Sequence, residues 1–145
     1  MNNQVLDEKQ IRKVIDLYAV YADEKETIRQ VALFTDNYNF EVFYDSTSIE
    51  PTQSLSGKEN LFQLFTESLS PFNKTMHFNG QSIIEFKSEN EANGVLYCRA
   101  YHYNNIENTE KIMVAIIKYK DKFQKIDNEW YFSERKLYVQ WIENR

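Results

Sequence analysis

Apolar side chains recur every three or four residues in the first half of the chain, which is the period of a helix that buries one face. This period predicts a helix over about residues 5–22, a second helix that starts at Asp23 and carries Ile28 to Phe34, and a third that follows Ser56–Glu59 and ends at Pro71. Between the second and third helices, residues 38–44 alternate with a period of two, which predicts a half-buried strand.

The second half of the chain alternates with a period of two over much longer stretches. Strands are predicted near 74–87, 91–104, 111–125 and 129–142, joined by turns rich in Asn and Glu. Helices followed by antiparallel hairpins indicate an α+β fold. Because strands of this length curve, we expect the helices to close the concave side of the sheet. Gly80 marks a position where a bulge would help the sheet to bend.

The strand predicted at 91–104 has two contrasting faces. Small or apolar side chains that end in a histidine form one face: Ala92, Gly94, Leu96, Cys98, Ala100 and His102. Larger, mostly aromatic side chains form the other: Val95, Tyr97, Arg99, Tyr101 and Tyr103. The first face leaves space beneath the helices, so we expect a pocket there. The second is costly to expose to water, which indicates an oligomer interface, in its simplest form a symmetric homodimer.

Composition narrows the class of protein. A chain of 145 residues fits one domain over 1–145, large enough for a core without disulfides or metal. The net charge of -5, with basic and acidic residues interleaved, argues against a nucleic-acid partner. No apolar run reaches membrane-spanning length, and the polar N-terminus is unlike a signal peptide. A single cysteine suits a reducing compartment, so we expect a cytoplasmic protein.

The two histidines are the main candidates for chemistry. His77 lies near the start of the first long strand and His102 near the end of the next. A histidine titrates near neutral pH and can act as a general base, and an aspartate on its other ring nitrogen would fix the tautomer and increase its basicity. Asp23 could be that partner, but "DEKE" also reads as a helix cap. The two roles are compatible because a carboxylate has two oxygens.

The orientation of these side chains is open at this point. Simple alternation groups His77 with polar neighbours and turns it away from the helices, unless a bulge near Gly80 changes the phase of the strand. His102 fits either a pocket or a solvent-exposed strand end. Cys98 fits a buried apolar position better than a nucleophile, since no basic residue is placed to activate it. No tight ligand spacing predicts a metal site.

Several motifs resemble one known family in their order and spacing. They are "LYAVYADEKETIRQVALFTDN", "SGKENLFQLF", "TMHFNG" and "YKDKFQKIDNEWYFSERKLYVQW", which together cover nearly the whole chain. The chain resembles the SnoaL-like branch of the nuclear transport factor 2-like superfamily. The resemblance implies a cone-shaped α+β fold in which three N-terminal helices and a curved antiparallel sheet enclose a pocket.

Within that family, the site resembles those of scytalone dehydratase and the bile-acid dehydratases. These enzymes pair a histidine at the start of the long strand with an aspartate at the end of the first helix, and Asp23 and His77 match those positions. His102 matches a second histidine of scytalone dehydratase. Ala22 and Val42 depart from the pattern, because that enzyme has catalytic tyrosines at or near these positions.

The resemblance implies a cofactor-independent dehydratase or isomerase that acts on a hydrophobic hydroxy-ketone. The Asp23–His77 dyad would remove a proton next to a carbonyl, and His102 would assist the leaving hydroxyl or bind a substrate oxygen. Four further residues are expected to contact the substrate: Tyr21, Tyr38, Tyr44 and Cys98. The alternatives are a non-catalytic dimeric module that binds a ligand or a protein, and the small subunit of an oxygenase, which shares this fold.

Overall fold

A computed structural model describes residues 2–145 of the chain. Helices and strands occur in the order predicted from the sequence, with a short additional strand before the third helix. The elements are α1 (Asn2–Asp23), α2 (Thr27–Val31), β1 (Phe34–Phe43), β2 (Gln53–Leu55), α3 (Lys58–Leu69), β3 (Lys74–Phe86), β4 (Glu91–Ile106), β5 (Thr109–Ile126) and β6 (Glu129–Asn144). None of the helices within 2–145 is long and apolar enough to cross a membrane.

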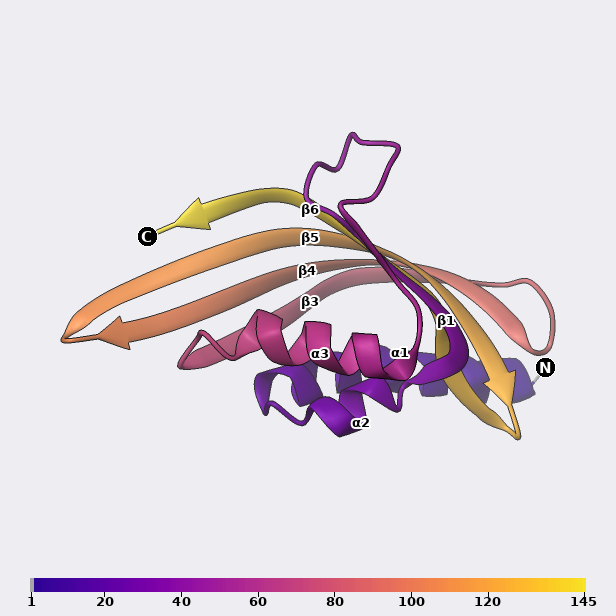
Figure 1. Cartoon of the computed structure of the whole chain (residues 1–145). Helices are drawn as coiled ribbons and strands as arrows, with labels where there is room; N and C mark the ends of the chain where they lie inside the picture. Colours follow the sequence, from indigo (N-terminus) through magenta and orange to yellow (C-terminus); the bar gives the residue numbers. More distant parts are fainter. Residues whose placement is uncertain (1) are drawn as a thin grey trace.

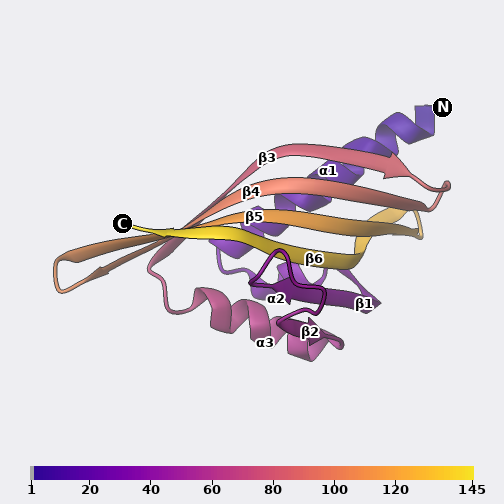
Figure 2. The same ribbon diagram turned by 90° about the horizontal axis from the view of Figure 1, so that it is seen from above.

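The strands form one curved sheet, and all three helices lie on its concave side (Figure 1). The strand order is β2-β1-β6-β5-β4-β3, which Figure 2 shows from above. The neighbours pair antiparallel except for β1 and β6, which are parallel. The predicted α+β fold is therefore confirmed, with one parallel pair in place of an entirely antiparallel sheet. The convex side carries no helix, and we call it the outer face.

The core lies between the helices and the concave side of the sheet. Tyr18 of α1 contacts Phe34, Phe65 and Phe132, with ring centroids 5.6 to 6.2 Å apart. Phe34 stacks on Phe132 at 4.9 Å, which joins the parallel strands β1 and β6. Burial of one such side chain contributes roughly 1.5–3 kcal/mol, so this aromatic cluster fixes α1 against the sheet.

The second predicted helix is wrong in its extent. α2 has only five residues, and Phe34 begins β1 instead of ending the helix. The stacking of Phe34 on Phe132 in the core outweighs the local helical period. The cap at "DEKE" is also wrong, because Glu26 is the N-cap of α2 and makes no side-chain cap hydrogen bond. The third helix, predicted to follow Ser56–Glu59, begins at Lys58, and Gly57 is its N-cap, with φ of 85°.

The predicted bulge near Gly80 is confirmed. The register between β3 and β4 shifts between Asn79, which pairs with Cys98, and Ser82, which pairs with Leu96. Before the bulge, His77 lies opposite the buried Ala100, so the two share the concave face. After the bulge, even-numbered residues take that face. The bulge thus turns His77 toward the helices.

Candidate active site

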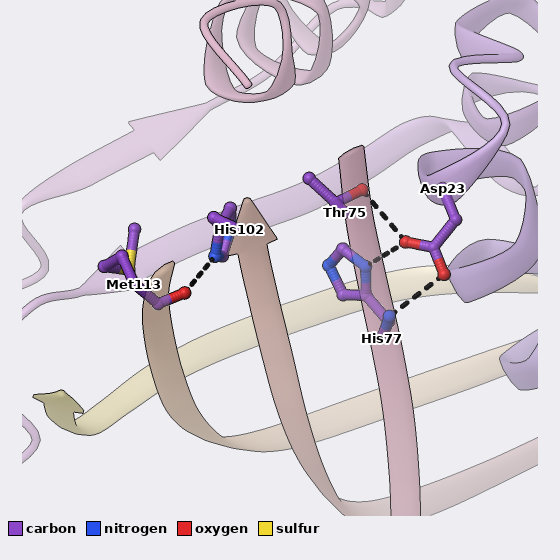
Figure 3. A network of polar contacts seen from close by, with 5 residues as sticks. All are labelled: Asp23, Thr75, His77, His102 and Met113. Atoms are coloured by element: carbon purple, nitrogen blue, oxygen red, sulfur yellow. Dashed lines mark hydrogen bonds and ion pairs between the residues drawn. The ribbon is translucent and has the colours of Figure 1, made fainter. Parts of the chain in front are cut away.

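Asp23 and His77 contact each other at the junction of α1 and β3. His77 Nδ1 lies 2.6 Å from Asp23 Oδ1, and the His77 backbone N–H donates to Asp23 Oδ2 at 2.9 Å (Figure 3). Thr75, two residues earlier and on the same face, donates its hydroxyl to Asp23 Oδ1 at 3.0 Å. Because Asp23 is the last residue of α1, these bonds also tie the helix end to the strand.

Asp23 is held in its ionised form. Its burial alone would raise the pKa, but the hydrogen bonds from the His77 ring, the His77 backbone and Thr75 lower the pKa below its ordinary value. An ionised carboxylate only accepts hydrogen bonds, so Nδ1 of His77 carries a proton toward it. In the neutral ring, Nε2 then has a free lone pair, and Figure 3 shows it on the side turned toward His102.

His77 lines a cavity of about 230 Å³ between the sheet and the helices. Most of its wall is apolar, with side chains from α3, β1, β5 and β6. The exposed lining residues Tyr44, Ser68 and Ile142 mark its mouth. The lining residues with polar side-chain groups are Tyr18, Gln30, Tyr44, Gln53, Ser68, His77, His102 and Tyr119. Asp23 does not line the cavity and acts on it only through His77.

His102 lines the same cavity. It lies on β4, where it pairs with Thr75 of β3. Its ring centroid lies 6.2 Å from that of His77 and 4.8 Å from that of Phe72. Burial lowers the pKa of His102 below its ordinary value, so the ring is neutral at pH 7. Nδ1 lies 3.2 Å from the carbonyl oxygen of Met113, which can only accept. Nδ1 therefore carries the proton, and Nε2 is left as a hydrogen-bond acceptor.

The tyrosines expected from the sequence are only partly at the cavity. Tyr44 is 60% exposed and lies at the mouth. Tyr21 and Tyr38 are not among the lining residues. The hydroxyl of Tyr38 is engaged elsewhere, because it donates to the Gly57 carbonyl oxygen at 2.6 Å. Periodicity predicts which side of an element faces the interior, but it does not predict where along the interior the cavity lies.

Cys98 also lies outside the cavity wall. It faces the concave side of the sheet, as the alternation predicted, and is buried in the core. Burial raises the pKa of the thiol to about 11, which leaves it protonated and unreactive at neutral pH. Within residues 2–145, no group of three or more His, Cys, Asp and Glu side chains is placed to hold a metal ion.

Tyr18 and Tyr119 line the cavity but were not identified from the sequence. The fully buried Arg135 lies against both rings, with its Cζ 4.2 Å from the ring centroid of Tyr18 and 3.5 Å from that of Tyr119. Its Nε is 3.0 Å from Oδ1 of Asp121, the residue that pairs with it across β5 and β6. Both tyrosines occupy core positions of regular elements, so periodicity could only assign them to packing.

The comparisons with known proteins agree with this fold. The family model for the SnoaL-like domain matches residues 3–136. A search of curated proteins finds no significant match. A candidate scytalone dehydratase from Novosphingobium aromaticivorans is similar in structure, with a TM-score of 0.83, 23% identity, and 99% of this chain and 91% of that chain covered.

Two further solved structures extend the comparison. The hexachlorocyclohexane dehydrochlorinase LinA-type3 from Novosphingobium barchaimii has a TM-score of 0.81 and 15% identity, over 99% of this chain and 92% of that chain. A nuclear transport factor 2-like protein with a cystatin-like fold from Novosphingobium aromaticivorans has a TM-score of 0.71 and 14% identity, over 94% and 84%. At these identities the structures support the fold alone. Since the family model spans nearly the whole chain, this protein belongs to the SnoaL-like domain family.

Proposed function

We propose that the protein is a cofactor-independent lyase or isomerase that removes a proton from a small hydrophobic hydroxy-ketone held in the cavity. The observation that carries this proposal is the 2.6 Å contact between Asp23 Oδ1 and His77 Nδ1, on a histidine that lines an apolar cavity. Aspartate on one ring nitrogen leaves the other free to accept a proton.

The reaction begins when Nε2 of His77 takes the proton from the carbon next to the substrate carbonyl. Asp23 stabilises the imidazolium that forms, and positioned proton transfer of this kind accelerates a reaction by roughly 10²–10⁴. The electrons of the broken C–H bond pass into an enolate. In a dehydration, the enolate forms the C=C bond and expels the hydroxyl group on the next carbon, which leaves as water with the proton from His77. In an isomerisation, His77 returns the proton to a different carbon.

The cavity also offers donors for the enolate oxygen. Tyr18 and Tyr119 are the enclosed tyrosines that line it, and Tyr44 lies at its mouth. Burial raises the pKa of Tyr18 to about 12, so it would donate a hydrogen bond without giving up its proton. The buried Arg135 lies against the Tyr18 and Tyr119 rings and favours negative charge on that side, although its ion pair with Asp121 offsets part of this effect.

The named relatives favour an elimination. A dehydratase expels water and a dehydrochlorinase expels hydrogen chloride, and both names belong to proteins with this fold. Each of these reactions begins or ends with proton removal from carbon. Because fold alone does not transfer function, the support for the proposal comes from the Asp23–His77 geometry.

We further propose that the outer face joins two copies of the chain. Phe78, Arg99, Ile116 and Trp141 pair in register across β3, β4, β5 and β6, so they form one row over the outer face. Phe78 is 51% exposed and Trp141 is 56% exposed. An exposed row with two aromatic side chains, an isoleucine and an arginine suits a self-complementary interface. The alternative function is a dimeric module that binds a ligand without converting it. A cytoplasmic location remains a prediction from the single cysteine.

Turnover of hydroxy-ketones tests the proposal directly. Wild type and the variants His77→Gln, Asp23→Asn and Asp16→Asn would be incubated with a panel of one- and two-ring β-hydroxy-ketones, and loss of water would be followed by ultraviolet absorbance. Asp16 is an exposed carboxylate on the same helix and serves as the control. We expect turnover in wild type and Asp16→Asn only. Binding of the same compounds with no turnover in wild type would favour the ligand-binding module.

A further inference from the structure

Gln30 is a buried polar residue that the proposed chemistry does not use. It lies on α2 and is only 2% exposed, yet it lines the cavity. Its backbone is fully employed, since its N–H donates to the Glu26 carbonyl and its own carbonyl accepts from Leu33. The side-chain oxygen Oε1 has no hydrogen-bond partner among the described residues. The unpaired atom is therefore the side-chain oxygen of Gln30.

An unpaired buried amide destabilises a fold, and packing does not require one here. Leucine or methionine would fill a similar volume, and the wall that Gln30 shares is largely apolar, with Phe40, Leu64 and Phe65 among its members. The backbone of Gln30 takes part in the hydrogen bonds of α2, but its side-chain oxygen does not. A polar group kept at this position indicates a partner that enters the cavity.

Gln30 also differs in its position from the polar lining residues nearest the mouth of the cavity. Tyr44 and Gln53 are exposed at or near the mouth, and Ser68 donates its hydroxyl to the Leu64 carbonyl. Gln30 is enclosed, so it faces the interior part of the cavity. The free volume of about 230 Å³ is below the roughly 300–1,000 Å³ of common ligand pockets, which limits a ligand to about one or two rings.

We propose that Gln30 determines the specificity of the cavity, by a hydrogen bond between its side-chain amide and a hydroxyl or carbonyl group on a one- or two-ring apolar ligand. This inference rests on the proposed function for the idea that the ligand is a substrate, and it names the substrate class. The amide presents both an acceptor and a donor, and rotation of its end group exchanges them, so it accepts from a hydroxyl or donates to a carbonyl. A hydrocarbon of the same shape would leave Gln30 unpaired and bind less tightly.

Affinity for a matched pair of probes tests the proposal. 2-Naphthol and naphthalene differ by one hydroxyl group, and their dissociation constants would be measured by NMR titration of backbone amide resonances. The variants are Gln30→Leu and, as the control, Gln63→Leu, which makes the same change at an exposed site on α3. Wild type and Gln63→Leu should prefer 2-naphthol by about tenfold, as expected for one hydrogen bond to a buried amide. In Gln30→Leu the preference should disappear.

Stability and turnover provide the remaining readouts. Gln30→Leu should melt no lower than wild type, because it removes an unpaired buried amide, so a lost preference would not reflect unfolding. A preference that persists in Gln30→Leu would overturn the proposal, and so would absence of saturable binding of both probes to wild type. The proposed function fails separately, if His77→Gln retains turnover, since the probe experiment measures binding alone.

Discussion

Asp23 holds His77 through both carboxylate oxygens, one on the ring nitrogen Nδ1 at 2.6 Å and the other on the backbone N–H at 2.9 Å. The same residue that ends α1 therefore fixes the position of the β3 backbone and the direction of the imidazole. With two contacts from one carboxylate, the ring cannot turn away without also weakening the link between helix and strand. The site and the fold share these bonds.

Removal of the Asp23 charge should change the stability of the protein in a pH-dependent way. The folded pKa of Asp23 is lowered, so its ionised form stabilises the fold; this contribution is complete above the unfolded pKa, near 3.8, and is lost as pH falls through the folded pKa. We expect Asp23→Asn to be less stable than wild type at pH 7, with a difference that shrinks below about pH 4.

Urea unfolding of both proteins at a series of pH values from neutral to acid measures this difference. Asp16→Asn, which changes an exposed carboxylate on the same helix, is the control and should match wild type throughout. A difference between wild type and Asp23→Asn that stays constant with pH would show that the carboxylate is not coupled to folding.

The second pH-dependent prediction concerns His102, a buried base that resists protonation. Its folded pKa is lowered by burial, so below about 6.5 the unfolded chain binds a proton before the folded chain does. Stability therefore falls as pH drops from about 6.5 toward the folded pKa, and levels off below it. His102→Gln lacks this group and should show a shallower decline over the same range.

Thermal unfolding of wild type and His102→Gln between neutral and mildly acid pH checks the slope. Burial raises the pKa of Asp121 to about 6, and that group gains its proton in the same range, but it is present in both proteins and cancels in the comparison. Equal slopes would indicate that His102 titrates as an exposed imidazole, which is the reading that the sequence left open.

The sequence predicted the strands well because alternation is a strong signal over stretches as long as β4 and β5. Gly80 even indicated the bulge that turns His77 toward the cavity. For Asp23 the sequence left two roles open, a helix cap and a partner of His77. Only the cap is wrong, because the carboxylate bonds to β3, more than fifty residues away in sequence. Short motifs carry no information about such distant contacts.

The cavity wall was harder to predict for a related reason. Tyr18 and Tyr119 have the same periodicity as the core residues around them. The contact of Arg135 with both rings, which only the structure shows, distinguishes them from those core residues. Gln30 lies in a helix of five residues, too short for a periodic signal. The parallel pairing of β1 and β6 was likewise hidden, because most of the chain separates the two strands in sequence.

The buried pair of Arg135 and Asp121 should be strongly coupled in stability. Both side chains are fully buried and lie 3.0 Å apart, from Nε to Oδ1. Arg135→Met leaves the Asp121 carboxylate buried without its counter-charge, and loss of one partner in such pairs costs about 3–5 kcal/mol. The double variant Arg135→Met with Asp121→Leu should be more stable than Arg135→Met alone. Urea unfolding of the two single variants and the double variant checks this, and additive losses would contradict it.

The outer face supplies the last prediction, which concerns assembly. Trp141 is 56% exposed at one end of the row that crosses β3 to β6. In a symmetric dimer each substitution occurs on both copies, so Trp141→Glu removes an apolar contact and places a charge in the interface twice. Loss of an aromatic anchor from an interface weakens association by about 2 kcal/mol or more, so this variant should sediment as a monomer at concentrations where wild type is a dimer. Ile28→Glu, at a position that is 75% exposed on α2, on the concave side of the sheet, is the matched control and should remain dimeric. A wild-type protein that sediments as a monomer at concentrations of about 100 µM would exclude the outer face as a stable dimer interface, since such an interface holds together well below that concentration.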